Sequence, residues 1–226
     1  MKIAVLGTGT VGRALAGKLA ELGHQVTIGT RDVAATLART EPDGMGGPPF
    51  RDWHAANPHI DLAAYAEAAA DADLVVNATH GAGSIEALEA AGRDDLAGVL
   101  VMDVANPLDF SAGMPPSLFV CNTDSLGEQI QRRFPDAHVV KTLNTMSASV
   151  MIDPGRVGGG DHSVFVSGDN TEAKRRVAEL LTAMGHTDVI DLGDITTARG
   201  PEMYLPLWLR LFGALGMPLL NIKVVR

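Results

Sequence analysis

The chain has 226 residues and a formal net charge of −9, from 18 lysines and arginines against 27 aspartates and glutamates. The acidic balance excludes a typical nucleic-acid-binding protein, which carries a basic surface, and a hydrophobic content of 46% excludes a mainly disordered chain. The single cysteine, Cys121, cannot form an internal disulfide, so we expect a cytoplasmic location.

The two ends of the chain predict neither export nor a membrane span. Met1–Lys2 leads directly into Ile3–Leu6, an apolar run too short for a secretory signal. The most apolar stretch, Tyr204–Leu220, contains Arg210 and is shorter than the ~20 residues that cross a bilayer. We interpret this stretch as a buried helix or a subunit contact, and we expect no membrane partner.

The first thirty residues predict a strand, a helix and a second strand. Ile3–Leu6 ends at a glycine, which is typical of a parallel strand buried on both faces. Thr10–Leu22 has apolar residues at helical spacing, and Gly23 follows where a glycine commonly ends a helix. Gln25–Gly29 is the next β-branched run and completes a βαβ unit.

Strands and helices continue to alternate along the rest of the chain. This alternation predicts an α/β fold with a doubly wound, mostly parallel sheet. We expect a first domain over 1–153 and a small C-terminal region of strands and a helix over 154–226. Further strands are predicted at 74–78, 99–103, 138–143, 163–168 and 189–191, helices at 61–72, 125–134, 170–184 and 195–220, a loop at 41–50 and a hinge or linker at 158–161.

The strongest chemical signal is the glycine-rich turn Gly7-Thr8-Gly9-Thr10-Val11-Gly12, which lies between the first strand and the first helix. In such a turn Gly7 permits the tight bend, Gly9 lets the backbone approach a pyrophosphate, and Gly12 allows close packing of helix on strand. Free backbone N–H groups and the positive end of the helix dipole then face the anion. The pattern predicts a dinucleotide site, although the glycines could also serve only the turn.

The end of the second strand indicates which dinucleotide binds. Sites for NAD usually place an acidic residue there, to bind the ribose hydroxyls. Here the strand ends in Thr30-Arg31, and a hydroxyl followed by an arginine suits the 2′-phosphate of NADP(H). Two alternatives stay open: a shift of one residue would put Asp32 on the ribose, and Arg31 could be an ordinary surface residue.

Small and amide residues follow three later strands. Because ligands of an open α/β sheet lie at the carboxyl ends of its strands, we expect these residues to line the nicotinamide pocket. The candidates are Ala78, Thr79, His80, Ala105 and Asn106 for the cofactor, and Asn144, Thr145 and Met146 for the substrate.

Other reactive side chains have competing interpretations. His80 could be a general acid–base, but no carboxylate lies near it in the sequence, so a loop hydrogen bond or packing beside the ribose is preferred. Lys141 could be a catalytic amine, although solvent exposure or pairing with an acidic residue is preferred. We expect Cys121 to be buried, and His162 and His186 to lie at the surface. No spacing of His, Cys and Asp indicates a metal site.

Three segments carry a resemblance to a known family. They are LGTGTVGRALAGKLAELGHQVTIGTRD, VVKTLNTMSASVM and FVSGDNTEAKRRVAELL. With their spacing, they make nearly the whole chain resemble the coenzyme F420-dependent NADP oxidoreductase family, F420 being a 5-deazaflavin. The same nucleotide domain occurs in bacterial proteins without known deazaflavin use and in eukaryotic membrane ferrireductases, as a flavin-reducing module.

The resemblance implies an N-terminal Rossmann domain and a smaller C-terminal part that forms the acceptor pocket and the contact of a homodimer. It implies reversible hydride transfer between NADP(H) and a deazaflavin. A His-Thr pair of the family aligns with Asn144-Thr145, so the histidine is absent and the acceptor is open between F420 and FMN or FAD. NADP contacts carry over to Thr8, Gly9, Thr10, Val11, Thr30, Arg31, Thr79, His80, Ala105 and Asn106.

The expected reaction needs positioning more than acid–base chemistry. Hydride transfer between stacked rings requires the reacting atoms to be held ~3–3.5 Å apart. The apolar segment Tyr204–Met217 would supply a wall of the acceptor pocket, in its own subunit or in the dimer partner. Met203, Tyr204 and Trp208, at helical spacing, could stack on a ring, although packing in the core is preferred.

Two other functions stay open. The first is an NADPH-dependent reductase of a small carbonyl or imine. Related dehydrogenases take a catalytic lysine from a large helical second domain, whereas here only about 70 residues follow residue 153 and they begin with a strand. The second is a regulator that senses NADPH without turnover.

Overall fold

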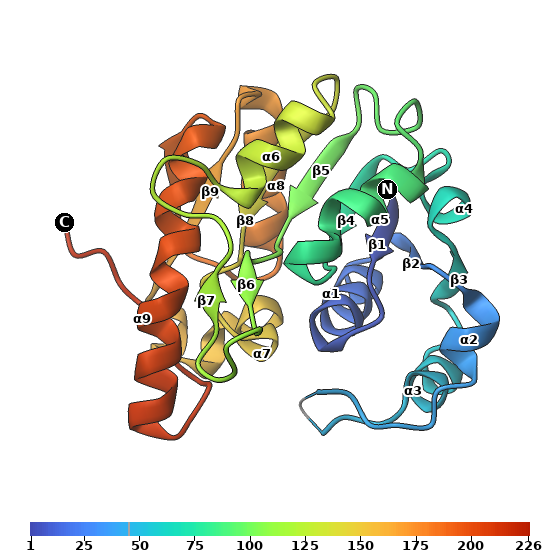
Figure 1. Ribbon diagram of the computed structural model, residues 1–226, viewed down its shortest axis with the longest axis horizontal. Helices are drawn as coiled ribbons and strands as arrows, with labels where there is room; N and C mark the ends of the chain where they lie inside the picture. The colour runs from blue at the N-terminus through green and yellow to red at the C-terminus, as the bar shows by residue number, and fades with distance from the viewer. Residues whose placement is uncertain (45) are drawn as a thin grey trace.

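The computed structural model describes residues 1–44 and 46–226, and Met45 of the predicted loop lies outside the described residues. Within the described part of the chain, eight strands form one sheet (Figure 1). Within this sheet, β8 and β9 form the one antiparallel pair among the described residues, which confirms the mostly parallel α/β fold. In spatial order the strands are β10 (Asp188–Gly193), β9 (Ser163–Ser167), β8 (His138–Thr142), β5 (Leu100–Asp103), β4 (Leu74–Asn77), β1 (Lys2–Leu6), β2 (Gln25–Thr30) and β3 (Asp61–Ala64).

Helices cover both faces of the sheet, and the first strand shows why its sequence is apolar throughout. Ile3 and Val5 join one buried cluster, together with residues of the first helix, while Ala4 and Leu6 join a second cluster on the opposite face. Successive side chains of a strand point to opposite faces, so a strand with two buried faces needs an unbroken apolar run. The first cluster takes residues from α1 (Thr10–Glu21), α3 (Phe50–Ala56), α7 (Ala148–Ile152) and α8 (Thr171–Ala183), and the second from α4 (Tyr65–Ala69), α5 (Ser84–Ala91) and α6 (Leu126–Arg133).

Two predicted helices differ in the structure. The helix expected over 61–72 is wrong in its first part, because Asp61–Ala64 instead forms β3 and extends the sheet beside β2. The helix expected over 195–220 is a short 3-10 turn, Ile195–Ala198, followed by α9 (Arg199–Leu215). It ends before Pro218 because Gly216 takes a left-handed conformation, with φ 67°.

Several short elements carry no signal in the sequence. The helices α2 (Val33–Leu37), α3 and α5 were not predicted. A small hairpin, β6 (Leu108–Asp109) and β7 (Ser117–Leu118), stands in front of the sheet near its carboxyl edge (Figure 1). This hairpin borders a cavity of the candidate site.

The C-terminal region continues the same sheet rather than building a second one, since β9 and β10 pair with each other and β9 pairs with β8. The boundary at residue 153 stays a prediction. After α9 the chain returns across the start of β9, where the Ser163 N–H donates to the Ile222 carbonyl and the Val224 N–H donates to the Ser163 hydroxyl.

Three expectations about burial are wrong. His162 and His186 are buried, and a hydrogen bond from each ring to a backbone carbonyl, of Pro154 and Met151 respectively, offsets the cost of burying the ring nitrogen. Cys121, expected to be buried, is exposed.

The last helix is only partly buried. Met203, expected in the core, is 38% exposed, and Leu207 on the outer face is 55% exposed, while Tyr204 and Trp208 are half-buried. The interpretation of Tyr204–Leu220 as a buried helix is therefore wrong for the outer face of α9. Of the helices in the described ranges, none combines the length and the apolar character that a bilayer span requires.

Candidate functional site

The glycine-rich turn has the geometry of a backbone cradle. Gly7 has φ +124°, and a Cβ there would lie 2.5 Å from the Ala78 carbonyl oxygen. A Cβ on Gly12 would lie 2.1 Å from the Gly7 carbonyl oxygen, so helix and turn pack too closely for any side chain. A Cβ on Gly9, in contrast, would meet nothing within 4 Å. Gly7 and Gly12 are thus required by the fold, while the space over Gly9 is open to a ligand.

Hydrogen bonds and an ion pair connect the loop after α2 to the start of α1. The Asp43 carboxylate accepts a hydrogen bond from the Thr10 hydroxyl (2.9 Å) and forms an ion pair with Arg13 (2.7 Å). Arg13 also donates to the Pro48 carbonyl (2.7 Å). The predicted loop over 41–50 therefore packs beside the glycine-rich turn.

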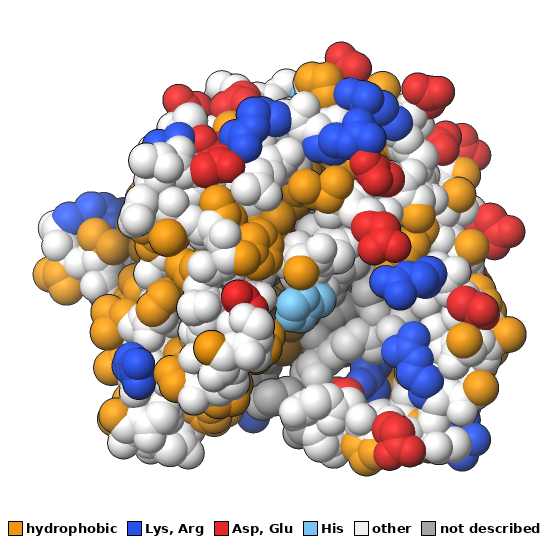
Figure 2. All heavy atoms as spheres, viewed as in Figure 1, with side chains coloured by type: hydrophobic (Ala, Val, Ile, Leu, Met, Phe, Trp, Pro, Cys, Tyr) orange, Lys and Arg blue, Asp and Glu red, His pale blue; other side chains and the backbone are white. Residues whose placement is uncertain are grey.

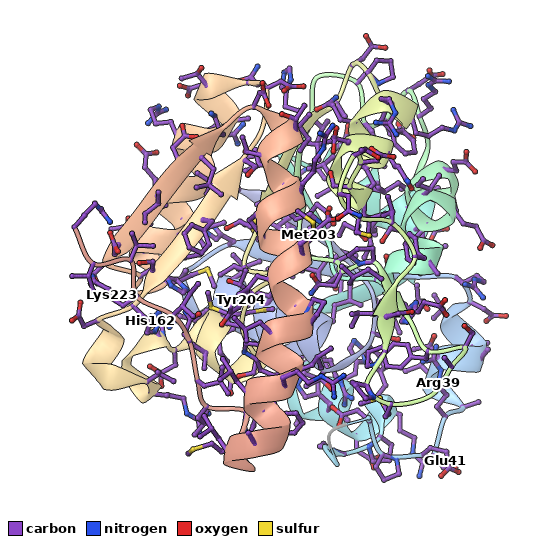
Figure 3. All side chains as sticks on the ribbon, turned by 60° about the vertical axis from the view of Figure 1, so that its left-hand side comes forward. Arg39, Glu41, His162, Met203, Tyr204 and Lys223 are labelled. Atoms are coloured by element: carbon purple, nitrogen blue, oxygen red, sulfur yellow. The ribbon has the colours of Figure 1, made fainter. Side chains whose placement is uncertain are left out.

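At the end of β2, hydroxyls and two guanidinium groups come together. The Thr30 and Thr36 hydroxyls share a buried hydrogen bond (2.7 Å), and Arg39 donates to Thr36 (2.9 Å) and to Thr8 of the turn (3.2 Å). Burial raises the pKa of Tyr65, while the positive charges of Arg31 and Arg39 act against this rise. Figure 3 shows Arg39 on the side of the molecule opposite Lys223.

Both arginines at this site are exposed, and among the residues that the structure describes neither forms an ion pair. An acidic protein thus presents two uncompensated cations beside its glycine-rich turn. Asp32, the alternative ribose ligand, instead accepts a hydrogen bond from the Ala35 N–H as the N-cap of α2. Arg39 was missed in the sequence; the available signal was a second arginine close behind Arg31 in an acidic chain.

The carboxyl ends of β4 and β5 line a cavity of about 190 Å³. This cavity lies next to the glycine-rich turn, because Val11 of α1 forms part of its wall. The structure therefore brings together one residue of the turn and all five cofactor candidates at the strand ends. The candidates that line it are Val11, Ala78, Thr79, His80, Ala105 and Asn106, joined by Gly81, Val104, Leu108 and Phe110.

None of the three substrate candidates lines this cavity. The Asn144 and Asn106 side chains pair: Asn106 Nδ2 donates to the Asn144 carbonyl (2.9 Å) and Asn144 Nδ2 donates to Asn106 Oδ1 (3.0 Å). Thr145 is buried, and Met146 packs in the main core cluster. Of these three residues, Asn144 contacts a residue of the cavity wall, because it holds the Asn106 amide in place.

A larger cavity of about 650 Å³ adjoins the first. The two share His80, Gly81, Leu108 and Phe110, and the His80 and Phe110 rings lie 5.7 Å apart between centroids. The larger cavity opens under the β6–β7 hairpin, and Figure 2 shows hydrophobic side chains gathered beside the hollow in this face. Its remaining lining residues are Ala82, Ile85, Asp109, Phe119, Leu126 and Gln129, none of which the sequence singled out.

Behind both strand ends lies a buried charge network centred on Lys141. Its ammonium forms ion pairs with Asp103 (2.6 Å) and Glu202 of α9 (2.8 Å), and donates to the Ala105 carbonyl (2.7 Å). Burial by itself lowers the pKa of Lys141, but the two carboxylates outweigh burial and hold this pKa above its ordinary value. The preferred interpretation of Lys141 as an ion-paired residue is confirmed, and the catalytic-amine alternative lacks an accessible, unpaired nitrogen.

Comparison with known proteins agrees with this geometry. Residues 2–107 match the family model described as NADP oxidoreductase, coenzyme F420-dependent. A crystal structure from Arthrobacter sp. FB24, provisionally named as an F420-dependent NADP reductase, is 67% identical over the whole of both chains, with a TM-score of 0.97. The F420-dependent NADP reductase of Methanothermobacter marburgensis is 26% identical over 93% of this chain and 92% of its own.

A relative with a different overall architecture is the metalloreductase STEAP3 of Rattus norvegicus. It is 28% identical over 92% of this chain, and the matched part makes up 38% of that protein. The chain therefore spans well under half of this relative's length. The full-length match to the Arthrobacter protein is what shows the family. This chain belongs to the coenzyme F420-dependent NADP oxidoreductase family and is an NADP-dependent oxidoreductase.

Proposed function

We propose that this protein transfers a hydride between NADPH and an isoalloxazine-type acceptor, either the deazaflavin F420 or a flavin. The observation that carries this proposal is the placement of two connected cavities at the end of the glycine-rich turn. The smaller cavity is bounded by all five predicted cofactor residues of β4 and β5, and the larger has the aromatic, apolar walls that a second ring needs.

The residues of this chain fit NADP(H). The open space over Gly9 and the first N–H groups of α1 suit a diphosphate, because the positive end of the helix dipole stabilises a bound anion. Thr30, Arg31 and Arg39 would hold the 2′-phosphate, since paired guanidinium groups bind phosphate with charge-assisted hydrogen bonds. Bound there, NADPH supplies the hydride.

At the reacting end, the protein would hold the reacting rings in position and exclude water. Asn106, fixed by Asn144, can offer its amide to the carboxamide of the nicotinamide ring. The buried Lys141 holds the Ala105 carbonyl and so stiffens the same wall. His80 packs against Phe110, which supports a packing role and leaves no need for general acid–base catalysis.

The two alternatives have less support. A sensor without turnover would need only the nucleotide site, whereas a second cavity of about 650 Å³ adjoins it. A reductase that depends on a catalytic lysine is disfavoured, because Lys141 is buried between two carboxylates.

We further propose a cytoplasmic homodimer. The support for a dimer is the outer face of α9, where Met203, Leu207 and Leu215 are exposed. Exposed apolar surface often marks a protein–protein contact, and a second subunit would cover these side chains. The single cysteine, exposed and unpaired, supports a reducing compartment.

An absorbance assay at the reduced-nicotinamide band tests the proposed reaction. Purified protein with NADPH is supplied in turn with F420, FMN, FAD and a panel of neutral carbonyls and cyclic imines. Consumption of NADPH with an isoalloxazine-type ring and not with the panel supports the proposal. Consumption with the panel alone would mean that the acceptor is a carbonyl or an imine and not an isoalloxazine-type ring. Binding of NADPH without any consumption would favour a regulator that senses NADPH.

A further inference from the structure

We propose that Glu202 of α9 is a positioning residue for the nicotinamide half of the cofactor, and that it acts through Lys141 on the peptide group between Ala105 and Asn106. This inference rests on the proposed placement of the nicotinamide at the ends of β4 and β5, and not on the identity of the acceptor. Glu202 lines neither of the two cavities, so it would act through its neighbours and not by touching cofactor or acceptor.

Glu202 lies on the inner face of α9 and is held there from two sides. It is 1% exposed, whereas the next residue, Met203, labelled on α9 in Figure 3, is 38% exposed. The Glu202 carboxylate accepts hydrogen bonds from the first two N–H groups of α6, those of Leu126 (2.8 Å) and Gly127 (3.0 Å). The positive end of the α6 dipole stabilises its negative charge, and the ion pair with Lys141 (2.8 Å) holds it from the other side.

Lys141 connects Glu202 to the end of β5. Three oxygen-bearing groups surround its ammonium: the carboxylates of Glu202 and Asp103, and the Ala105 carbonyl (2.7 Å). The three charged residues are each at most 1% exposed, so water cannot take the place of a missing partner. The direction of the Ala105 carbonyl is therefore set by a cation whose own position depends on Glu202.

The Ala105 carbonyl in turn sets the direction of the next N–H group. In a trans peptide the C=O and the N–H point to opposite sides, so the Asn106 N–H points away from Lys141. Among the described residues this N–H has no hydrogen-bond partner. Ala105 and Asn106 both line the cavity proposed for the nicotinamide. The Asn106 N–H is thus a donor available to the carboxamide oxygen of a bound nicotinamide ring.

A second set of hydrogen bonds connects the same cation to the end of β4. Asp103, the other ion-pair partner of Lys141, accepts from the Asn77 amide (2.8 Å). Asn77 accepts in turn from the hydroxyl of Thr79 (2.6 Å), which lines the same cavity. Loss of the negative charge at Glu202 would shift Lys141 toward Asp103, and both strand ends would respond.

Stability alone gives no reason for this network of buried charges. Well-packed apolar residues often serve a buried site equally well, because burying charges is costly. Apolar residues cannot, however, hold a carbonyl oxygen and a helix N-terminus in fixed directions. The charges therefore point to a requirement for orientation at the strand ends.

Calorimetry with two ligands separates positioning from general destabilisation. NADPH carries the nicotinamide, whereas 2′-phospho-ADP-ribose has a hydroxyl in its place and is otherwise the same molecule. Glu202→Gln keeps the shape of the side chain and removes its charge. This variant is expected to bind NADPH roughly fivefold more weakly, the value of one hydrogen bond, and to change binding of 2′-phospho-ADP-ribose by less than about twofold.

Glu128→Gln is the matched control. Glu128 is also a buried carboxylate between α6 and α9, but the ion pair and hydrogen bonds of its side chain go to Arg199 and Ser125. Its loss should lower the unfolding temperature and leave the ratio of the two affinities unchanged. Glu202→Asp, one methylene shorter, is measured in the same way where Glu202→Gln does not fold, and the same selective loss is expected.

Because neither measurement contains an acceptor, the result does not depend on the proposed hydride transfer. Weaker binding of NADPH alone in the Glu202 variant, absent from Glu128→Gln, supports the positioning role even where no acceptor is reduced. Equal weakening of both ligands would make Glu202 a structural residue only. Unchanged binding of both ligands, the same selective loss in Glu128→Gln, or equal affinity of the unmodified chain for the two ligands would also overturn the inference.

Discussion

The Arg39 guanidinium donates a hydrogen bond to the hydroxyl of Thr8, with 3.2 Å between Nη1 and Oγ1, and so connects the segment after α2 to the glycine-rich turn. The same side chain donates to Thr36, which is bonded to Thr30 at the end of β2. A phosphate on the adenosine ribose would meet this connected group of hydroxyls and cations, because it lies between the turn and the strand end.

Arg31→Ala and Arg39→Ala should each weaken NADPH binding by roughly 10- to 100-fold, the value of a charge-assisted hydrogen bond. NADH lacks the 2′-phosphate, so its affinity should change by no more than about threefold. Isothermal titration calorimetry with both nucleotides measures this ratio. Arg175→Ala, an exposed arginine on α8 that pairs with Glu172, is the control and should change neither affinity. Equal losses of affinity for NADPH and NADH would show that these arginines do not bind the 2′-phosphate.

Gly9→Val and Gly12→Val should fail in different ways. A side chain on Gly9 meets open space, so this variant should fold with a near-normal unfolding temperature and lose nucleotide binding. A Cβ on Gly12 would lie 2.1 Å from a backbone oxygen, so this variant should be strongly destabilised. Thermal unfolding and calorimetry on the pair check both outcomes. A folded Gly9→Val that binds NADPH normally would show that the turn is only structural.

Lys141→Met should destabilise the fold severely. It leaves Asp103 and Glu202 buried without their cation, which typically costs about 3–5 kcal/mol. For a chain of this size the loss corresponds to a fall of roughly 6–20 °C in the unfolding temperature. Lys18→Met, at a surface ion pair with Glu21, is the matched control and should shift the unfolding temperature by less than about 2 °C. A small shift in Lys141→Met would mean that the network adds little to stability.

His186 should make the fold sensitive to mild acid. Burial is the largest cause that lowers its pKa below 6.5, and the nearby His162 acts in the same direction. As the pH falls, this histidine is protonated in the unfolded chain at a higher pH than in the folded chain. The free energy of unfolding is therefore fully retained above about pH 6.5 and falls as the pH drops below it. The loss is at most about 1.4 kcal/mol per pH unit for one group.

Urea unfolding at about pH 7.5 and pH 5.5 measures this effect. His186→Gln can still donate to the Met151 carbonyl and should reduce the difference between the two conditions. His59→Gln, an exposed histidine, should leave the difference unchanged. An equal acid response in all three proteins would assign the sensitivity to other groups.

The glycine-rich turn and the strand ends were predictable because their signals are local. Gly7 and Gly12 are fixed by contacts within the turn and to β4, and the apolar run of β1 reports that both its faces are buried. Parallel strands share one carboxyl edge, so Ala78 and Asn106 had to meet once the topology was known.

The hairpin and the buried histidines were not predictable, because they depend on contacts between distant residues. The strands β6 and β7 are two residues each, too short for any periodicity, so the exposed Phe110 and Phe119 gave no signal. His162 is buried partly by Asn221, 59 residues later, whose amide lies 2.8 Å from the His162 Nδ1. A search for apolar alternation or fixed motifs cannot find such a partner.

The most direct test of the account follows the hydride itself. NADPH carrying deuterium at the transferring position of C4 is incubated with the protein and oxidised F420 in ordinary water, and the reduced deazaflavin is analysed by mass spectrometry. Direct transfer predicts that the deuterium appears on the reduced deazaflavin ring, because the hydride passes from one ring to the other without exchanging with water. Reduced deazaflavin without deuterium, or no reduction although NADPH binds, would contradict direct transfer to this acceptor.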